Sequence, residues 1–250
     1  MPRGKQYAIE LEIEGRAAMF ARPDTGATPT SYPLPTFSAC KAMLECVALL
    51  SDGAAWFRPT SVSVCRRLDQ PGRPSLRWLG YTTNYGGPLR KSNQVRGGNN
   101  LQLIATALAE PCYRITAVVE GRRLGGGRNP RHHLQDLFNR RLRQGRVYRT
   151  PCLGWSEFTA DYWGPFRDGT NGRPHRTEID PDVNMTIPSM LFSVWDRAVG
   201  GRVRDTFLQD VVVERGTLRF PESLPPGIGE PAAAGGPSDA AFGEGRDDAE

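Results

Sequence analysis

The segment that decides the fold is NPRHHLQDLFNRRLRQG, residues 129–145. Asn129 is a preferred N-cap residue, and Pro130 suits the first helical position because the N–H that proline lacks would be unpaired there. Gly145 can adopt the left-handed conformation that ends many helices. We therefore predict a helix from Pro130 to about Gly145. Its apolar residues recur at helical spacing and are Leu134, Leu137, Phe138 and Leu142.

Strand-like and helix-like segments lie on both sides of this helix. Residues 7–13 alternate in hydrophobicity with a period of two, which predicts a strand with Glu10 and Glu12 on its wet face. Thr36 can cap a first helix that extends to about Leu50. Segment 86–100 is rich in Gly and Asn and is expected to be an exposed loop. The other predicted strands are 62–64, 78–81, 112–120 and 207–213, the last in a hairpin with 218–220.

The order of these elements predicts an α+β fold. Two helices would cover one face of an antiparallel sheet, in the ferredoxin-like or RNA-recognition-motif plan. We expect this domain to span residues 1–145 and a β-rich extension to span 146–220. Residues 221–250 hold mainly Pro, Gly, Ala and acids. Because they contain too few large apolar side chains to offset the conformational entropy lost on ordering, this tail is predicted to be disordered.

Length and composition exclude several classes of protein. The chain has 250 residues, and no apolar run reaches the roughly 18 residues of a membrane-spanning helix. The N-terminus lacks the basic-then-apolar pattern of a signal peptide, which predicts a cytoplasmic protein. The cysteines are odd in number and form no CxxC pair, which argues against a disulfide framework and a zinc site. They are expected to be free thiols, at Cys40, Cys46, Cys65, Cys112 and Cys152.

The positive charge is concentrated in one part of the chain. The net charge is +5, but residues 221–250 carry seven acids and one base, which leaves +11 on residues 1–220. Arginine supplies 29 of the 32 bases, and its planar fork suits phosphate. A genome of high GC content would also favour arginine over lysine along the whole chain. Clustering of the arginines must therefore distinguish this explanation from phosphate binding. Residues 121–149 hold nine arginines against one acid, Asp136, which favours a phosphate-binding surface.

Two adjacent histidines, His132 and His133, lie in the first turn of the predicted arginine-rich helix. A helix N-terminus favours an anion and a neutral imidazole, which is the form that acts as a general base. One histidine could take the proton from a ribose 2′-hydroxyl, and attack on the adjacent phosphate would cleave RNA without a metal and leave a 2′,3′-cyclic phosphate. Alternatively, the two side chains, roughly 100° apart around the helix, are one packed and one wet, with no chemistry.

Signatures of other chemistries are missing from the sequence. No grouping of His, Asp and Glu has the spacing of metal ligands, and no G-x-S-x-G motif is present. Glycines 125–127 lack the lysine and Ser/Thr of a phosphate-binding loop. We therefore expect no cofactor and no metal.

Several blocks occur together in an order and spacing typical of one family. They are SYPLPT at 31–36, followed by Lys41 and Glu45, then NPRHH at 129–133, FNRR at 138–141, Gly145 and PCLGWSEF at 151–158. The chain thereby resembles the CRISPR-associated Cas five family of subtype I-C, also called the Dvulg type, within the RAMP superfamily. The resemblance runs from about residue 6 to 165, with looser similarity to about 220.

The resemblance implies a ferredoxin-like fold with a β-rich extension. It also implies cleavage of the repeat in precursor CRISPR RNA without metal, after which the protein stays on the 5′ handle beside other subunits of the type I-C interference complex. The family's site combines a tyrosine late in the first helix with a basic residue and a histidine at the start of the second. These positions fall on Ala48, His132 and His133. The expected RNA contacts are Arg128, Arg131, Arg140, Arg141, Lys41 and Tyr32.

Ala48 leaves the activity open because its methyl group cannot give or take a proton. In one hypothesis the chain is an endoribonuclease with His133 as general base or acid, His132 in support, and Tyr32 or a water in the missing proton step. In another it is an inactive subunit that caps the 5′ handle of the guide. A different RNA-binding protein with the same fold would explain the charge but not the LGWSEF block.

Overall fold

The computed structural model describes residues 6–26, 28–84, 102–122, 129–169, 175–193 and 206–222. The expected loop at 86–100 and the expected disordered tail from residue 223 onward lie outside these residues, as does Arg128. Within them no helix is long and apolar enough to cross a membrane.

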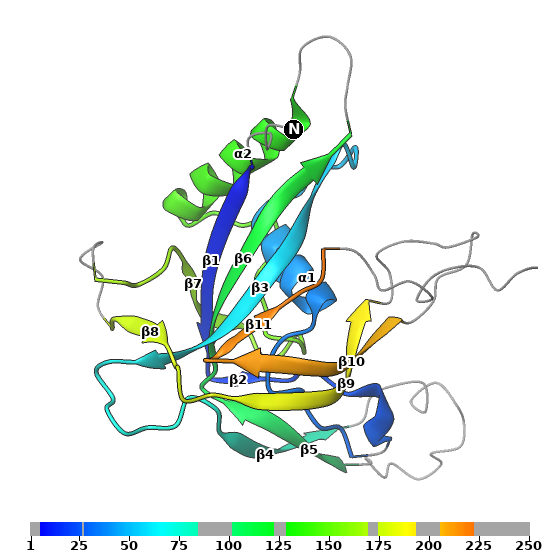
Figure 1. Cartoon of the computed structure of the whole chain (residues 1–250), viewed down its shortest axis with the longest axis vertical. Helices are drawn as coiled ribbons and strands as arrows, with labels where there is room; N and C mark the ends of the chain where they lie inside the picture. Colours follow the sequence, from blue (N-terminus) through cyan, green and yellow to red (C-terminus); the bar gives the residue numbers. More distant parts are fainter. Residues whose placement is uncertain are drawn as a thin grey trace, which may run out of the picture.

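An antiparallel sheet forms the centre of the described structure (Figure 1). Its strands follow the order β7-β1-β6-β3-β11-β10-β9, and β8 pairs with β3 outside this path. Their bounds are β1 Ala8–Gly15, β3 Ala55–Arg67, β6 Cys112–Gly121, β7 Ala160–Gly164, β8 Thr177–Ile179, β9 Met185–Ser193, β10 Thr206–Glu214 and β11 Thr217–Arg219. A smaller sheet has the order β2-β5-β4, formed by β2 Ala17–Ala18, β5 Gln102–Ala109 and β4 Trp78–Asn84. A short 3-10 helix spans Pro23–Thr25.

Both predicted helices are present, and their ends have the predicted caps. Helix α1 spans Phe37–Val47, and the Thr36 hydroxyl accepts the Ala39 N–H at its start. Helix α2 spans Pro130–Gln144, with Asn129 as N-cap and Gly145 in the left-handed conformation at φ 65°. Helix α1 is shorter than predicted, because Ala48 is already extended.

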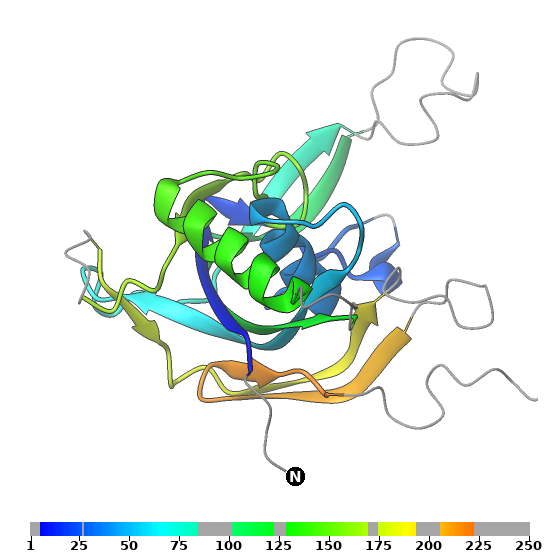
Figure 2. The same cartoon turned by 90° about the horizontal axis from the view of Figure 1, so that it is seen from above.

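The helices pack on the same face of the central strands. Both contact β3 and each other, and Figure 2 shows them on one side of β1, β6 and β3. The Phe57 ring of β3 meets the Phe138 ring of α2 edge to face, with centroids 5.3 Å apart. The Phe37 ring of α1 stacks on Phe192 of β9 at 4.2 Å, so the residues expected to form the extension share the core of the first part.

A mixed α/β fold with antiparallel sheets and few helices is therefore confirmed. The hairpin of β10 and β11 is also as predicted. The proposed boundary after residue 145 stays a prediction, and the large sheet crosses it, because β7 pairs with β1 and β11 pairs with β3. Strand β5 was not predicted, since its alanine-rich sequence carries little strand signal.

The expected wet face of β1 is wrong at one position. Glu10 is exposed, but Glu12 is completely buried. Its carboxylate accepts hydrogen bonds from Arg167 and Arg114, which lie far along the chain. The alternation correctly predicts which residues face the helices, namely Ile9, Leu11 and Ile13, but not what covers the opposite face.

All five cysteines are free thiols, as predicted. Three of them, Cys40, Cys65 and Cys112, are buried, and the other two are half-buried. Burial raises the pKa of the Cys40 thiol well above its usual value, which makes it a poor nucleophile.

Position 154 of the LGWSEF block requires glycine because of its backbone conformation and its close neighbours. The residue has φ 90°, and a Cβ there would overlap the carbonyl oxygen of Met19. Gly154→Ala is therefore expected to destabilise the protein by about 3 kcal/mol and to lower its Tm by roughly 6–12 °C. Thermal unfolding monitored by circular dichroism measures the change.

Gly145→Ala is the matched control, because Gly145 also has a positive φ but has open space around its Cβ position. Its expected cost is about 1 kcal/mol, from the left-handed backbone alone. Equal losses in the two variants would contradict the overlap with Met19.

Candidate functional site

The first turn of α2 carries the two histidines singled out by the sequence. The Asn129 side chain accepts the N–H of Arg131 at 3.2 Å, and the Asn129 carbonyl accepts the N–H of His133 at 3.1 Å. Both imidazoles are exposed, so the alternative of one packed and one wet histidine is wrong. His132 Nε2 lies 3.1 Å from Asp136 Oδ2, one turn further along the helix.

The side of α2 opposite its buried stripe forms a continuous polar surface, which we call the outer face. It consists of His132, His133, Asp136, Arg140 and Arg143, which share one side at 3.6 residues per turn and are all exposed. Among the residues that the structure describes, Arg140 and Arg143 form no ion pair with a carboxylate. The outer face therefore presents positive charge that an anionic partner can neutralise.

Two other arginines of α2 lie elsewhere. Arg131 is half-buried, and its guanidinium lies 5.4 Å from the centre of the Tyr7 ring. Arg141 donates from Nη1 to the carbonyl of Val47 at 3.0 Å and so caps the end of α1. The expected contact of Arg141 with RNA stays a prediction, although its Nη1 atom already binds the Val47 carbonyl. Arg143, which is outside the expected contacts, lies on the outer face.

The expected contact at Tyr32 does not fit its position. Tyr32 is 1% exposed, and its hydroxyl accepts the N–H of Leu191 at 3.1 Å. Burial raises the pKa of Tyr32. A side chain buried in this way contacts no surface ligand. Tyr32 is therefore a core residue and not an RNA contact. Lys41 lies half-buried on α1.

Ala48, where the family resemblance expects a tyrosine, is completely buried at the end of α1. The preceding carbonyl, that of Val47, accepts from Arg141. Arg141 follows His133 by eight residues, a distance of about 12 Å along the helix axis. Ala48 therefore lies beside the second half of α2, whereas the histidines lie in its first turn.

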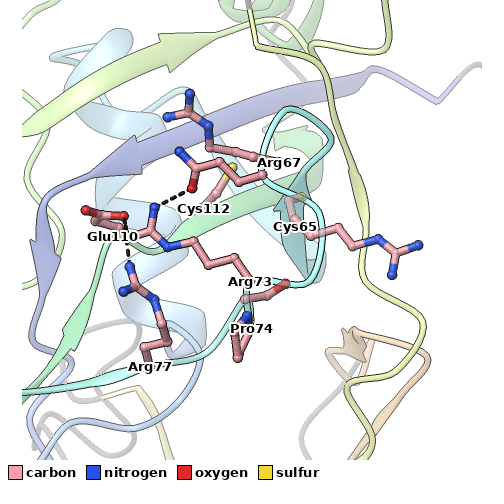
Figure 3. Close-up of a pocket in the computed structure, with 10 residues that line it drawn as sticks. Cys65, Arg67, Arg73, Pro74, Arg77, Glu110 and Cys112 are labelled. Carbon is pink, nitrogen blue, oxygen red and sulfur yellow. Dashed lines mark hydrogen bonds and ion pairs between the residues drawn. The ribbon is translucent and has the colours of Figure 1, made fainter.

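A pocket on another part of the molecule is also rich in arginine (Figure 3). Its arginines are paired with acids: Arg73 and Arg77 both pair with Glu110, and Arg67 pairs with Glu14 at 3.2 Å. Arginine content alone therefore does not mark a phosphate site in this protein. The outer face of α2 differs from this pocket because its acid, Asp136, lies against His132, and its two arginines form no ion pair with a carboxylate of the described residues.

No family model matches the chain. Its sequence is 27% identical over 201 residues to the CRISPR pre-crRNA endoribonuclease Cas5d of Thermus thermophilus, a match that covers 80% of this chain and 78% of that protein. This match supports a Cas five family. The relative is similar along most of its length.

Solved structures agree in fold. A structure described as a CRISPR-associated protein has a TM-score of 0.58 at 18% identity and covers 87% of this chain and 95% of its own. A functionally uncharacterized protein from Streptococcus mutans has a TM-score of 0.57 at 16% identity, with 86% and 92% covered. At these identities the likeness shows a shared architecture only.

Proposed function

We propose that this chain is a CRISPR-associated RNA-binding protein that cleaves the repeat of precursor CRISPR RNA without metal. In this proposal it then stays on the 5′ handle of the guide as a subunit of the type I-C interference complex. The observation that carries the proposal is the pair of exposed histidines in the first turn of α2, on the same face as Arg140 and Arg143. The relative's name supports the choice of RNA substrate.

The first turn of α2 suits in-line cleavage beside a ribose. The N-terminus of the helix and the outer face would hold the phosphates. His133 would take the proton of the 2′-hydroxyl as general base. The 2′-oxygen would form its bond to phosphorus as the bond to the 5′-oxygen breaks, and the 5′-oxygen would take a proton from a water molecule, with His132 and its Asp136 contact in support. The products are a 2′,3′-cyclic phosphate and a 5′-hydroxyl.

The strand order supports the ferredoxin-like part of this proposal. Strand β6 lies between the parallel strands β1 and β3, which α1 connects, and β7 follows α2 on the other side of β1. This is the order expected of a β-α-β-β-α-β unit. Strands β9, β10 and β11 would then be the β-rich extension, on the other side of β3.

A second candidate function is an inactive subunit that caps the 5′ handle. Ala48 favours it, because a methyl group stands where the family resemblance implies a tyrosine. In this case another nuclease makes the cut, and the outer face of α2 serves binding alone.

Incubation of the purified protein with its genomic repeat RNA, 5′-labelled and in EDTA, separates these functions. A single cut that ends in a cyclic phosphate supports the endoribonuclease. Tight binding without a cut supports the capping subunit. Binding of the repeat no tighter than an unrelated RNA of equal length would overturn both.

The two arginines of the outer face predict how the affinity for RNA depends on salt concentration. Arg140→Ala combined with Arg143→Ala is expected to reduce the slope of log K against log salt by about 1.4 for single-stranded repeat RNA, or about 1.8 if the contact is to duplex. The physical reason is that two fewer phosphates are neutralised and fewer counterions are released. Filter binding at several salt concentrations between about 50 and about 300 mM measures this slope.

Arg73→Ala combined with Arg77→Ala is the control, because it removes the same charge from the pocket in which both arginines pair with Glu110. Its slope is expected to equal that of the unmodified protein. The same decrease in both double variants would mean that net charge, and not the outer face, controls binding.

A further inference from the structure

The four residues 146–149, which we call the RVYR segment, follow α2 and are held in place by their backbone. The first N–H of the segment donates to the Arg141 carbonyl at 2.9 Å and closes the end of α2. The N–H groups of Tyr148 and Arg149 both donate to the carbonyl of Cys46 in α1, at 2.8 and 3.0 Å. The side chains of the RVYR segment therefore extend from a backbone that is tied to both helices.

Tyr148 is the most exposed aromatic side chain in the described part of the chain, at 65%. Within that part, its ring has no aromatic partner and no cation over its face. Both faces of an exposed ring can be covered by a planar partner. Single exposed apolar side chains are common, however, so the surroundings of Tyr148 must decide whether a ligand binds there.

The surroundings of Tyr148 along the chain are basic. Arg143, Arg146 and Arg149 are exposed, and residues 143–149 contain no acid. None of these three arginines forms an ion pair with a carboxylate of the residues that the structure describes. Their positive charge is therefore left for an anionic partner, as on the outer face of α2.

The other exposed aromatic side chain of the described residues provides a contrast. Trp78 is 52% exposed and lies on β4 of the smaller sheet. Its neighbour in the chain, Arg77, pairs with Glu110 at 2.8 Å. An exposed ring beside arginines without a carboxylate partner is therefore a property of the RVYR segment that the surface at Trp78 does not share.

This combination suits a single strand of RNA. Every base has a flat face that stacks on an aromatic ring, and arginine binds the phosphates beside it. An acidic protein surface would satisfy the arginines alone, whereas RNA satisfies both the charge and the ring. Gly145, at the end of α2, follows His133 by twelve residues, which is about 18 Å along the helix axis. The RVYR segment would thus meet a part of the RNA outside the first turn of α2.

We infer that Tyr148 is a stacking platform for one base of the bound RNA, with Arg146 and Arg149 on the phosphates beside that base. This inference rests on the RNA-binding part of the proposed function and needs no cleavage. The contact serves an endoribonuclease and a capping subunit equally. Because every base can stack on the ring, the platform adds affinity and does not select a sequence.

The test measures the Kd of Tyr148→Ala for 5′-labelled repeat RNA by filter binding. Removal of the ring is expected to raise Kd about 5- to 150-fold, the range for the loss of one stacked base. Tyr148→Phe keeps the ring and removes only the hydroxyl, so its Kd is expected to stay within about twofold of the unmodified protein. Trp78→Ala is the matched control, since it removes an exposed ring beside a paired arginine, and it is expected to leave Kd unchanged.

The dependence of binding on salt separates stacking from charge. Stacking releases no counterions, so the slope of log K against log salt in Tyr148→Ala is expected to equal that of the unmodified protein. Arg146→Ala combined with Arg149→Ala is expected to reduce this slope by about 1.4 for single-stranded RNA. Thermal unfolding of each variant checks that the fold is intact.

Several results would overturn the inference. Tight binding of the repeat with an unchanged Kd in Tyr148→Ala would do so, and loss of another subunit of the complex from that variant would make Tyr148 a protein contact. An equal loss of affinity in Tyr148→Phe would mean that the hydroxyl acts and not the ring. If the unmodified protein binds the repeat no tighter than an unrelated RNA of equal length, the proposed function fails first, and the inference fails with it.

Discussion

Replacing His133 with alanine is expected to slow cleavage of repeat RNA by about 10²- to 10⁴-fold, with affinity for the RNA within a few-fold of the unmodified protein. The rate falls because the 2′-hydroxyl loses the group that removes its proton. The fold is expected to be unaffected, since His133 is exposed and alanine is the best helix former. Single-turnover rates in EDTA and filter binding measure the two quantities on the same preparation.

The third histidine provides the control for this experiment. His175 lies 30 or more residues after α2 in the sequence, and its Nδ1 atom lies 2.7 Å from Asp69 Oδ2 and 2.8 Å from Arg67 Nη2. Its backbone has φ 63°. His175→Asn is the suitable change because asparagine tolerates that backbone conformation. It is expected to cut at the normal rate. An equal loss of binding and cleavage in His133→Ala would make His133 a binding residue, and a normal rate would place the chemistry elsewhere.

The sequence predicts α2 well because every signal for it is local. Asn129 caps, Pro130 starts and Gly145 ends the helix within a stretch of 17 residues, and each acts on its own neighbours. The position of the histidines in the first turn follows from these signals alone. The sequence also shows that the arginines lie mostly off the apolar stripe.

The partners of these residues depend on tertiary structure, which local patterns do not contain. Arg141 follows Leu137 by four residues and Phe138 by three, which places it on the apolar side of the helix. Only the fold, however, brings the Val47 carbonyl to it, from 94 residues away. Tyr7 fits the strand pattern of β1, and nothing local indicates its contact with Asn129, 122 residues later. The sequence signal that could have paired Tyr7 with Asn129 is an aromatic residue next to a strand together with a helix start rich in polar residues.

The burial of Glu12 fails to follow from the sequence for the same reason. Alternation places it on a wet face, but the segment after β7 and the strand β8 bring Arg167 and Thr177 over it from more than 150 residues away. Residues that look solvated in one strand thus become the centre of a buried polar network. Such a network is visible in the sequence only as unexplained charges in separate segments.

This network gives the largest expected effect on stability. Glu12 accepts from Arg167 Nε at 2.6 Å, from Arg114 Nε at 3.0 Å and from the Thr177 hydroxyl at 2.9 Å. The Arg167 side chain is 5% exposed. Burial alone would lower the pKa of Arg167, but its hydrogen bonds to the carboxylates of Glu14 and Glu12 outweigh that effect and raise the pKa, so this residue is charged in the folded protein.

Glu12→Ala is expected to reduce the free energy of unfolding by about 3–5 kcal/mol, because it leaves buried guanidinium groups with too few acceptors. This loss corresponds to a decrease in Tm of roughly 6–20 °C for a chain of this size. Urea or thermal unfolding measures it. Glu10→Ala is the matched control, since Glu10 lies on the same face of the same strand but is exposed, and its change is expected to be within about 0.5 kcal/mol.

The same variant separates stability from chemistry. Glu12 follows Tyr7 by five residues, about 17 Å along an extended strand, and lies on the face of the sheet opposite the helices. The folded fraction of Glu12→Ala is therefore expected to cut RNA at the normal rate at temperatures well below its Tm. If Glu12→Ala costs no more than Glu10→Ala, the buried network does not stabilise the sheet. If the variant is stable but slow, the charge of Glu12 acts on the α2 site through the sheet, and its role is electrostatic instead of structural.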